Sequence, residues 1–534
     1  MHHIQFRSPE DRLIARLLPE QATANPDATW LMMDETTCTF GEAHATVERL
    51  AGGFQEIGIL QGDTVALMLE NSMEYVWTVL ALATIGAVGI PINTAYKGYF
   101  LRSILETSRP TAVVVETELA EVVAGAIADL PIKTVICRGG NASELSSVRS
   151  ESFEALLSSD HDLAPVPLRH RDPVSVMFTG GTTGSSKGVI QTNDTWIAGA
   201  EMSSGGQDLR ADDRYYSVTP MFHSGAWVMV LYPSLLYGLP VGLESRFSVK
   251  DFWRRVKHYG ATQLFTLGAM HLWLWGEPAA PEDSRSTARV WTAVPLPADL
   301  WEVFPQRFGV KLCSAYGQTE IMPFSIAGAN GSYKPGSAGI VRSDMEASII
   351  DEHDRPVPTG EPGELVVRPK VPDVLFGGYY RMPVETLQTF RNLWYHTGDL
   401  CRIDADGELF FVDRKADYLR RRGENISSME VEDVVRHHPD IVGVAVHSVP
   451  ADESEDEMKL CVTLSEGSTL TPLEIAEFCD ANLPYFAVPR YIEIVDELPI
   501  TPVGRVQKFV LRERGITRDT WDAHAAGFRP SRPR

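Results

Sequence analysis

The sequence predicts an α/β protein: a large N-terminal domain of parallel sheets covered by helices, a β-barrel-like subdomain, and a small α+β C-terminal domain. The chain has 534 residues, and a single hydrophobic core stops growing at roughly 250–300 residues, so at least two domains are expected. Helical and strand-like patterns alternate through the first third, which is typical of α/β folds. From about residue 337, hairpin patterns rich in Pro and Gly replace this alternation, and they predict antiparallel structure.

The first third contains one helical pattern and several short apolar strands. Gly41–Ile57 has apolar residues at helical spacing, and the turn Gly62-Asp63 leads into the continuous apolar run Val65–Leu69. Ala112–Val115 and Lys133–Cys137 are further candidate strands. Strands that are apolar throughout predict a mostly parallel sheet with both faces covered.

Hairpin signals follow residue 337. Ala347–Asp351 and Glu364–Arg368 are predicted strands joined by a turn rich in Pro and Gly, and Glu408–Val412 follows the turn Asp406-Gly407. An Asp-Gly pair between apolar runs is a strong hairpin signal. We therefore expect an antiparallel, barrel-like subdomain at the end of the large domain.

The C-terminal part is predicted to be a compact α+β unit. Its predicted elements are helices over Ser428–His437 and Pro472–Asn482 and strands over Ile441–Val449, Lys459–Leu464 and Tyr491–Val495. We place the boundary in the charged stretch that begins at residue 413. The large domain then spans 1–413 and the small domain 414–534, with a hinge near 413–417.

Composition excludes several classes of protein. The net charge is −23, which repels phosphate backbones and argues against nucleic-acid binding, although a nucleotide needs only a local pocket. The six cysteines form no CxxC pair, so reduced core thiols in a cytoplasmic protein are expected. The longest apolar segment, Tyr75–Ile92, is broken by Gly and Pro. We interpret it as a buried helix followed by a buried strand, and no membrane span is predicted.

A loop rich in Gly, Thr and Ser follows the strand Val174–Phe178. Such a loop turns backbone NH and hydroxyl groups toward an anion, with Lys187 beside them. It is not a Walker loop, because Ser186 precedes the lysine and Gly188 follows it. A flexible surface loop is the alternative, but the position directly after a buried strand disfavours it. The residues assigned to phosphate binding are Thr179, Gly180, Gly181, Thr182, Thr183, Gly184 and Lys187.

This loop resembles the phosphate-binding loop of the adenylate-forming superfamily, which includes acyl-CoA synthetases, luciferases and peptide-synthetase adenylation domains. The stretch Phe411–Glu432 is most similar to the acyl-CoA ligase branch, particularly the carnitine/crotonobetaine-CoA ligase type. The chain also resembles secondary-metabolite ligases that activate diterpenoid acids of the platensimycin type. The motifs that carry the resemblance, in the family's order, are Pro220–Gly225, Tyr316–Glu320, Gly363–Leu365, Gly378-Tyr379, Trp394–Asp399, Asp413–Lys415, Gly423–Ile426 and Gly504–Val506.

The resemblance implies a reaction in two halves. A carboxylate attacks the α-phosphate of ATP to give acyl-AMP and pyrophosphate, and the CoA thiol then displaces AMP. The small domain rotates between the halves, so that one cleft serves both. The implied cofactor is Mg²⁺ with ATP, ATP/AMP and CoA are substrates or products, and the partner is a hydrophobic carboxylic acid or its acyl-adenylate. A homodimer is left open.

The resemblance also assigns residues to the nucleotide. Tyr316 corresponds to the ring that stacks on adenine, and Thr319 to a hydrogen-bond partner of the α-phosphate. Glu320 is expected to hold Mg²⁺, which prefers hard oxygen ligands. Asp399 is expected to accept both ribose hydroxyls, and Arg414 to reach the same nucleotide. The remaining positions are Gly317, in the motif of Tyr316, and Ala293 and Pro295, in a loop that lacks the family's paired glycines.

Two further sites concern the acyl group and CoA. His223 is expected between the acyl pocket and the approach of the thiol, as a gate or orienting group in preference to a general base, because a thiol needs only modest help to ionise. Gly423 is expected to line the pantetheine tunnel with Arg422 and Glu424, since a Cβ there crowds the chain. Arg420–Arg422 either meet CoA phosphates or are simply solvated. The predicted acyl pocket consists of Phe222, Trp227, Val228, Met229, Leu267, Gly268, Met270 and Ile321, and its large apolar members favour a hydrophobic acid.

Two positions depart from the family pattern. The usual charged hinge residue is replaced by Ala416, with Asp417 next. The catalytic lysine of adenylation is replaced by Arg505, which follows Gly504, and Lys508 lies too far along to substitute. Arginine keeps the charge but is a wide planar fork that does not occupy the same space.

We therefore expect an acid–thiol ligase that forms the thioester but adenylates weakly or not at all. Misplacing one oriented cation costs roughly 10²–10³-fold in rate. One alternative is a complete two-step synthetase in which Arg505 works adequately. A non-catalytic acyl-adenylate-binding protein is the alternative of another class, and it is disfavoured because Thr319, Glu320, Asp399 and Gly423 are all present.

Overall fold

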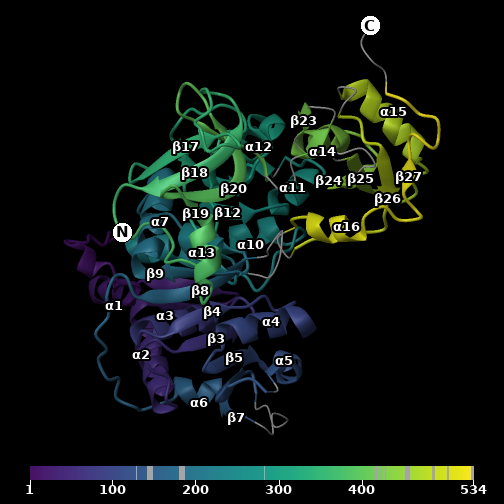
Figure 1. Ribbon diagram of the computed structural model, residues 1–534. Coiled ribbons are helices and arrows are strands. Elements are labelled where there is room, and N and C mark those ends of the chain that lie inside the picture. The colour runs from purple at the N-terminus through teal and green to yellow at the C-terminus, as the bar shows by residue number, and fades with distance from the viewer. Residues whose placement is uncertain are drawn as a thin grey trace.

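The structure is a computed structural model of the chain. It describes all residues except 128, 141–147, 180–186, 282, 415–418, 422–423, 427, 451–456, 484–486, 502–503 and 531–534, and all side chains of the rest except those of 99, 100, 420, 421, 424, 425 and 430. The described strands form sheets of seven, nine and five strands, followed by sheets of two and four strands nearer the C-terminus. Figure 1 shows the C-terminal elements set beside the large body.

The seven-stranded sheet, with the order β7-β6-β5-β3-β4-β8-β9, is parallel except for the β8–β9 pair. Neighbouring residues of β3 enter two different cores, which explains its continuous apolar sequence: Val65 and Leu67 pack with α2 and α3, and Ala66 and Met68 pack with α4 and α5. Its strands are β3 (Thr64–Met68), β4 (Val88–Pro91), β5 (Ala112–Glu116), β6 (Thr134–Arg138), β7 (Arg149–Ser152), β8 (Pro173–Thr179) and β9 (Lys187–Thr192).

The nine-stranded sheet, with the order β16-β15-β14-β13-β12-β10-β11-β1-β2, has a parallel centre and antiparallel edges. Our sequence analysis did not place its strands. They are β1 (Thr29–Met33), β2 (Thr36–Thr39), β10 (Tyr215–Ser217), β11 (Val241–Leu243), β12 (Gln263–Leu267), β13 (Val290–Val294), β14 (Lys311–Tyr316), β15 (Ser325–Ala327) and β16 (Ile340–Val341).

The helices of the large body cover these sheets (Figure 1). They are α1 (Ile14–Ala24), α2 (Phe40–Glu56), α3 (Met73–Thr84), α4 (Gly98–Ser108), α5 (Ala120–Ile127), α6 (Phe153–Leu157), α7 (Asn193–Gly206), α8 (Ser224–Ala226), α9 (Tyr232–Tyr237), α10 (Phe252–Tyr259), α11 (Met270–Gly276), α12 (Val303–Phe308) and α13 (Pro383–Thr389), with a π-helical turn, η3, at Trp227–Leu231.

The five-stranded sheet is antiparallel throughout, with β21 paired to β20. It follows the two large sheets in the chain, so the prediction of an antiparallel subdomain after parallel sheets is confirmed. The strands are β17 (Met345–Ile350), β18 (Gly363–Pro369), β19 (Phe390–Arg391), β20 (Trp394–Ile403) and β21 (Leu409–Arg414).

The C-terminal elements enclose a core of their own, in which α14 and α15 pack on β24–β26. The predicted α+β character is confirmed, whereas the division at residue 413 stays a prediction. The elements are β22 (Leu419–Arg421), β23 (Glu424–Ile426), α14 (Ser428–Arg436), β24 (Ile441–Val449), β25 (Glu457–Leu464), α15 (Pro472–Asn482), β26 (Tyr491–Ile494), α16 (Lys508–Arg514) and β27 (Trp521–Asp522).

Two smaller expectations agree with the structure. The apolar segment Tyr75–Ile92 lies in α3 and β4, a buried helix followed by a buried strand. Among the described residues, none of the helices combines the length and the apolar character of a membrane span. All the cysteines are buried, free thiols.

Candidate active site

Asp399 is the centre of a buried hydrogen-bond cluster. The Tyr316 hydroxyl donates to Asp399 Oδ2 at 2.8 Å, and Gln318 Nε2 donates to the same oxygen at 2.7 Å. Asp399 Oδ1 is a buried atom that accepts no hydrogen bond from the described residues, although Arg414 Nε lies 3.2 Å away in an ion pair. This oxygen is therefore a carboxylate acceptor with capacity for a ligand hydroxyl.

The register of the antiparallel sheet explains the Asp399–Arg414 pair. The two residues lie directly opposite each other on β20 and β21, where side chains of opposite charge on neighbouring strands attract each other. Tyr316 ends β14, and its ring lies nearly parallel to that of Phe411 with centroids 6.1 Å apart. The consecutive strands β20 and β21 and the distant end of β14 thus supply one cluster.

The hydroxyl group of Tyr316 is the hydrogen-bond donor in its contact with Asp399. Burial and the neighbouring Asp399 carboxylate raise the pKa of its hydroxyl well above the ordinary value. The proton therefore stays on the phenol and points at Asp399. Gln318, which lies in the same motif but was not assigned a role from the sequence, also donates to the Thr397 carbonyl at 2.8 Å and accepts from the Tyr395 hydroxyl at 2.9 Å.

A second cluster joins Glu320 to β9, the strand that follows the predicted phosphate loop in the sequence. The Tyr379 hydroxyl donates to Glu320 Oε1 at 2.9 Å, and Lys187 Nζ lies 4.9 Å from the centroid of the Tyr379 ring. Burial raises the pKa of Glu320, while the Tyr379 hydrogen bond and the charges of Arg414 and Lys187 oppose that rise. Thr319 is held through its carbonyl, which accepts from Gln191 Nε2.

This second cluster suits a hard cation. Mg²⁺ is usually bound through one or two carboxylates together with substrate phosphates. Glu320 provides a carboxylate, and Lys187 provides a cation for phosphate oxygens. These donors fit an Mg·ATP complex.

His223 is a neutral imidazole at the N-cap of α8. Burial, together with the positive charge of Arg505, lowers its pKa to about 4. Its Nε2 atom is buried without a hydrogen-bond partner among the described residues, and its ring lies 4.8 Å from that of Phe222. A base this weak takes up few protons near neutral pH, which favours an orienting or gating role over general-base catalysis.

Arg505 lies in a short hairpin that rests on the large body. A Cβ built on Gly504 is only 2.5 Å from Ala269 Cβ and 2.9 Å from Trp273 Cζ2, and the backbone of Gly504 has φ +76°. The hairpin therefore docks closely at the start of α11, and only glycine fits there.

The docked hairpin places the Arg505 charge near the Asp399 cluster. Surrounding protein atoms and the charge of Arg414 lower the pKa of Arg505, and Asp399 opposes this, but by accessible surface Arg505 is an exposed residue. Lys508, by contrast, forms an ion pair with Glu432 at 2.8 Å and donates to Ser428 Oγ at 2.5 Å. Both of these partners of Lys508 belong to the predicted small domain.

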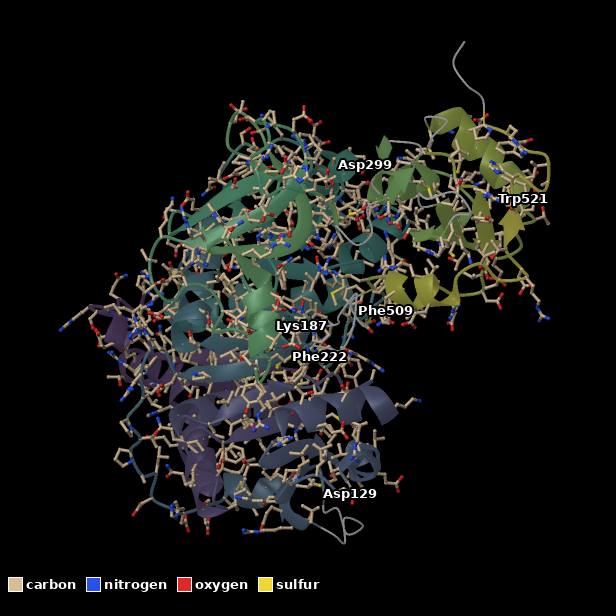
Figure 2. All side chains as sticks on the ribbon, in the orientation of Figure 1. Asp129, Lys187, Phe222, Asp299, Phe509 and Trp521 are labelled. Atoms are coloured by element: carbon tan, nitrogen blue, oxygen red, sulfur yellow. The ribbon has the colours of Figure 1, made fainter. Side chains whose placement is uncertain are left out.

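Figure 2 labels Lys187 and Phe222 on the large body and Phe509 on α16. The segment that precedes α16 reaches the large body through Gly504, which contacts Ala269 and Trp273, and its Arg505 acts electrostatically on His223.

The predicted acyl-pocket residues have different surroundings. Trp227, Val228 and Met229 lie on η3 and pack into the main core, and Trp227 Nε1 donates to the Met221 carbonyl at 2.7 Å. Leu267 and Gly268 lie at the end of β12, directly before Met270 on α11, and Gly268 has φ +64°. Ile321 is buried beside Tyr316 in another core cluster, and its amide donates to the Gln318 carbonyl at 3.1 Å.

Some of the predicted site residues lie away from the Asp399 and Glu320 clusters, and others are not among the described residues. Ala293 is fully buried, with its carbonyl accepting from Ser314 Oγ at 3.0 Å, and the Pro295 carbonyl lies 2.7 Å from His271 Nε2. The Thr179 hydroxyl donates to the Lys187 carbonyl at 3.4 Å, and Gly317 follows β14. Outside the described residues lie Gly180, Gly181, Thr182, Thr183, Gly184, Ala416, Asp417, Arg422 and Gly423, together with the side chain of Glu424.

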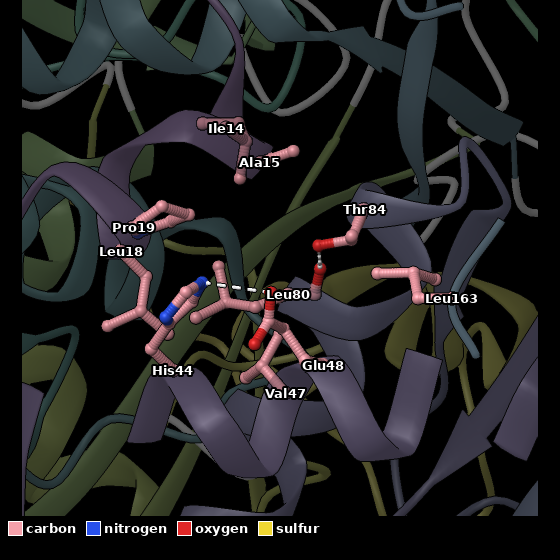
Figure 3. A pocket seen from close by; sticks show the side chains of 10 residues that line it. All are labelled: Ile14, Ala15, Leu18, Pro19, His44, Val47, Glu48, Leu80, Thr84 and Leu163. Atoms are coloured by element: carbon pink, nitrogen blue, oxygen red, sulfur yellow. Dashed lines mark hydrogen bonds and ion pairs between the residues drawn. The ribbon is translucent and has the colours of Figure 1, made fainter. Parts of the chain in front are cut away.

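A cavity of about 80 Å³ lies between α1, α2 and α3 (Figure 3). It is lined mainly by apolar side chains such as Ile14, Leu18 and Leu80, with the His44–Glu48 pair at its edge. None of the predicted site residues lines it, so this cavity is separate from the site.

Comparison with known proteins agrees with this geometry. Residues 18–380 match the family model of the AMP-binding enzyme, and residues 430–505 match that of the AMP-binding enzyme C-terminal domain. The crotonobetaine/carnitine–CoA ligase of Salmonella paratyphi A is 32% identical over 482 residues, covering 88% of this chain and 92% of that protein. The chain therefore belongs to the AMP-binding family of adenylate-forming enzymes. Within it, the chain is an acyl-CoA ligase, which is an acid–thiol ligase.

Solved structures have the same fold. ATP-bound MatB from Rhodopseudomonas palustris superposes with a TM-score of 0.83 at 24% identity, covering 94% of this chain and 98% of that chain. The anthranilate CoA ligase AuaEII in complex with anthranoyl-AMP gives a TM-score of 0.84 at 23% identity, covering 94% of this chain and 97% of that chain. The predicted α/β fold with a small C-terminal domain is confirmed.

Proposed function

We propose that this acyl-CoA ligase forms its thioester readily from acyl-AMP and CoA, whereas its formation of acyl-AMP from ATP is weak or absent. The observation that carries the proposal is the position of Arg505. The cation that the docked hairpin brings toward His223, Arg414 and Asp399 is a guanidinium. The nearby Lys508 is bound to Glu432 and leaves no ammonium from this segment for the cleft.

The nucleotide end of the site has the donors and acceptors that AMP requires. The Asp399 carboxylate accepts hydrogen bonds from both ribose hydroxyls, the Tyr316 ring stacks on adenine, and Arg414 approaches the same nucleotide from β21. Thr319 bonds the α-phosphate, and we assign the other phosphates to Lys187 and the Gly- and Thr-rich segment before it. Glu320 binds Mg²⁺, which neutralises phosphate charge when it is bound.

The proposed thioester step needs little from the protein beyond orientation. The sulfur of CoA, as thiolate, bonds to the acyl carbon, and the bond from that carbon to the AMP phosphate oxygen breaks. The thiol proton passes to solvent. His223, neutral and beside Phe222, orients the approach, and we assign Gly423, Arg422 and Glu424 to the pantetheine tunnel.

The adenylation step depends more strongly on where a positive charge is placed. An oxygen of the substrate carboxylate bonds to the α-phosphorus while the bond to pyrophosphate breaks, and negative charge builds up between the two reactants. A compact ammonium fits that space, whereas the planar guanidinium of Arg505 is wider and differently directed. The expected loss is roughly 10²–10³-fold.

We propose a hydrophobic acid as substrate, because Trp227, Met229, Met270 and Ile321 are large and apolar. A diterpenoid acid of the platensimycin type is one such acid. A cytoplasmic location, a homodimer and the division into 1–413 and 414–534 also stay predictions.

A complete two-step synthetase is the second candidate, and the retained positive charge of Arg505 favours it. A non-catalytic acyl-adenylate-binding protein is the third. The test is pyrophosphate exchange with ATP across a panel of acids, and separately acyl-CoA formation from the matching acyl-AMP plus CoA.

We expect little exchange by the parent protein, ready thioester formation, and a gain in exchange of roughly 10²-fold for Arg505→Lys. Robust exchange by the parent protein would establish the two-step synthetase. Failure to convert any supplied acyl-AMP across the panel would favour the binding protein.

A further inference from the structure

Lys508 anchors the base of the hairpin that carries Arg505. The Thr501 amide donates to the Arg505 carbonyl at 2.7 Å, and the Gln507 amide donates to the Pro499 carbonyl at 2.7 Å. The hairpin is thus closed by backbone hydrogen bonds directly before α16, whose first residue is Lys508. Whatever holds Lys508 therefore also limits where the backbone of Arg505 lies.

A continuous set of contacts connects Lys508 to the end of β21. Lys508 Nζ donates to Ser428 Oγ at 2.5 Å, and the same ammonium pairs with Glu432 Oε1 at 2.8 Å. The hydroxyl and the amide of Ser428 both donate to Asp413 Oδ2, each at 2.7 Å. Asp413 directly precedes Arg414, the residue paired with Asp399.

These groups are shielded from water. Asp413, Ser428 and Glu432 are buried, and the Lys508 side chain is 12% exposed. Hydrogen bonds to charged groups are stronger than neutral ones, and burial makes an unpaired charge expensive. Separating one partner therefore leaves another buried polar group unsatisfied.

We propose that Lys508 is a positioning residue that couples the Arg505 hairpin, through Ser428, to Asp413 at the hinge, and so favours the arrangement with Arg505 in the cleft. This inference rests on the proposed division near residue 413 and on the proposed rotation of the small domain. Under that division, the Asp413–Ser428 hydrogen bonds join the two domains. Rotation about a hinge that follows Asp413 breaks them.

A contact that only supports the fold of the small domain stabilises both arrangements equally. An equilibrium between two arrangements shifts only when a contact is made in one and not in the other. The decisive quantity is therefore the ratio of the two arrangements, and not the overall stability.

The experiment measures that ratio with spin labels. Val303 on α12 and Leu473 on α15 are exposed, at 42% and 45%, while the native cysteines are all buried. The Val303→Cys/Leu473→Cys protein, labelled at both sites, gives a distance distribution by double electron–electron resonance. Lys508→Met and Ser428→Ala are compared with Arg514→Met, which removes a charge from an exposed position on the same helix.

We expect Ser428→Ala, which removes the hydroxyl that bonds to Asp413, to shift the ratio of the two arrangements roughly tenfold away from the docked one, the scale of one hydrogen bond to a charged group. Lys508→Met leaves that hydroxyl in place without the ammonium that orients it, and is expected to shift the ratio in the same direction by a smaller factor. Arg514→Met is expected to match the parent. In the Arg505→Lys background, Ser428→Ala is expected to lower pyrophosphate exchange about tenfold while acyl-CoA formation from acyl-AMP is kept.

Unchanged distance distributions in both variants would overturn the proposal. A parallel fall of both half-reactions together with the unfolding temperature would also overturn it, because that pattern belongs to a purely structural contact. The distances need no turnover. Strong adenylation by the parent protein would therefore disprove the proposed function and leave this test intact.

Discussion

At the scale of single residues, the two oxygens of the Asp399 carboxylate have different surroundings. Oδ2 accepts from Tyr316 and Gln318, whereas Oδ1 accepts no hydrogen bond from the described residues. The motif predicted Asp399 and Tyr316 as site residues but left Gln318 without a role. A motif names residue types at fixed spacing, and it does not say which side chain turns inward.

Glu320 provides a prediction at this scale. Glu320→Ala is expected to weaken the metal-dependent part of ATP binding about tenfold or more, because a carboxylate ligand for Mg²⁺ is lost. Isothermal titration calorimetry with and without Mg²⁺ measures the effect. Glu320→Gln is the matched control for shape, since its amide oxygen still accepts from the Tyr379 hydroxyl. Equal responses of all three proteins to Mg²⁺ would remove Glu320 from the metal site.

At the scale of elements, the hairpin before α16 is a part of the C-terminal region that contacts the large body, at Ala269 and Trp273. Its tight approach to Ala269 and Trp273 depends on the absence of a side chain at Gly504. The sequence predicted the glycine from the motif. It did not predict which surface the glycine faces, because α11 lies more than two hundred residues earlier in the chain.

Gly504→Ala is predicted to undock this hairpin. The new Cβ lies 2.5 Å from that of Ala269, so the hairpin moves away and adenylation falls about tenfold or more in the Arg505→Lys background. Gly467→Ala is the control, because Gly467 has a similar φ of +81° with nothing within 4 Å. Pyrophosphate exchange checks the comparison, and equal rates in the two variants would contradict the docked hairpin.

At the scale of the whole molecule, buried histidines couple stability to pH. His271 is fully buried, with Nε2 2.7 Å from the Pro295 carbonyl and Nδ1 3.1 Å from Thr266 Oγ1. Burial lowers its pKa to about 4, against 6.5 in the unfolded chain. The ring is therefore neutral in the folded protein, with Nε2 as the donor.

The free energy of unfolding is predicted to fall as the pH drops from 6.5 toward 4, because His271 binds a proton in the unfolded chain and stays neutral in the folded protein. The contribution is complete above about pH 6.5 and amounts to about 3 kcal/mol at most for this residue. Urea unfolding at several pH values measures it, and His271→Gln should reduce the slope by nearly one proton. A variant with the parent's slope would show that His271 is not the group responsible.

The amino-acid sequence by itself determined the family, the antiparallel part after residue 337 and most elements of the small domain. β24 and α15 begin and end where they were predicted. Local patterns suffice there because apolar spacing, caps and turns act over a few residues. The sequence also singled out Arg505 and Ala416 as departures from the family pattern, and what Arg505 does to adenylation stays a prediction.

Only the tertiary structure decided which distant residues meet. Segments far apart in the chain meet in four places. These are the nine-stranded sheet, the Tyr316–Asp399 hydrogen bond, the close contact of Gly504 with the start of α11, and the contacts of Lys508. No local pattern encodes such pairs, because they depend on how sheets and helices pack as whole layers. Lys508 illustrates the reason. The sequence shows that the residue is positively charged, but the direction in which its side chain points depends on the buried carboxylate of Glu432.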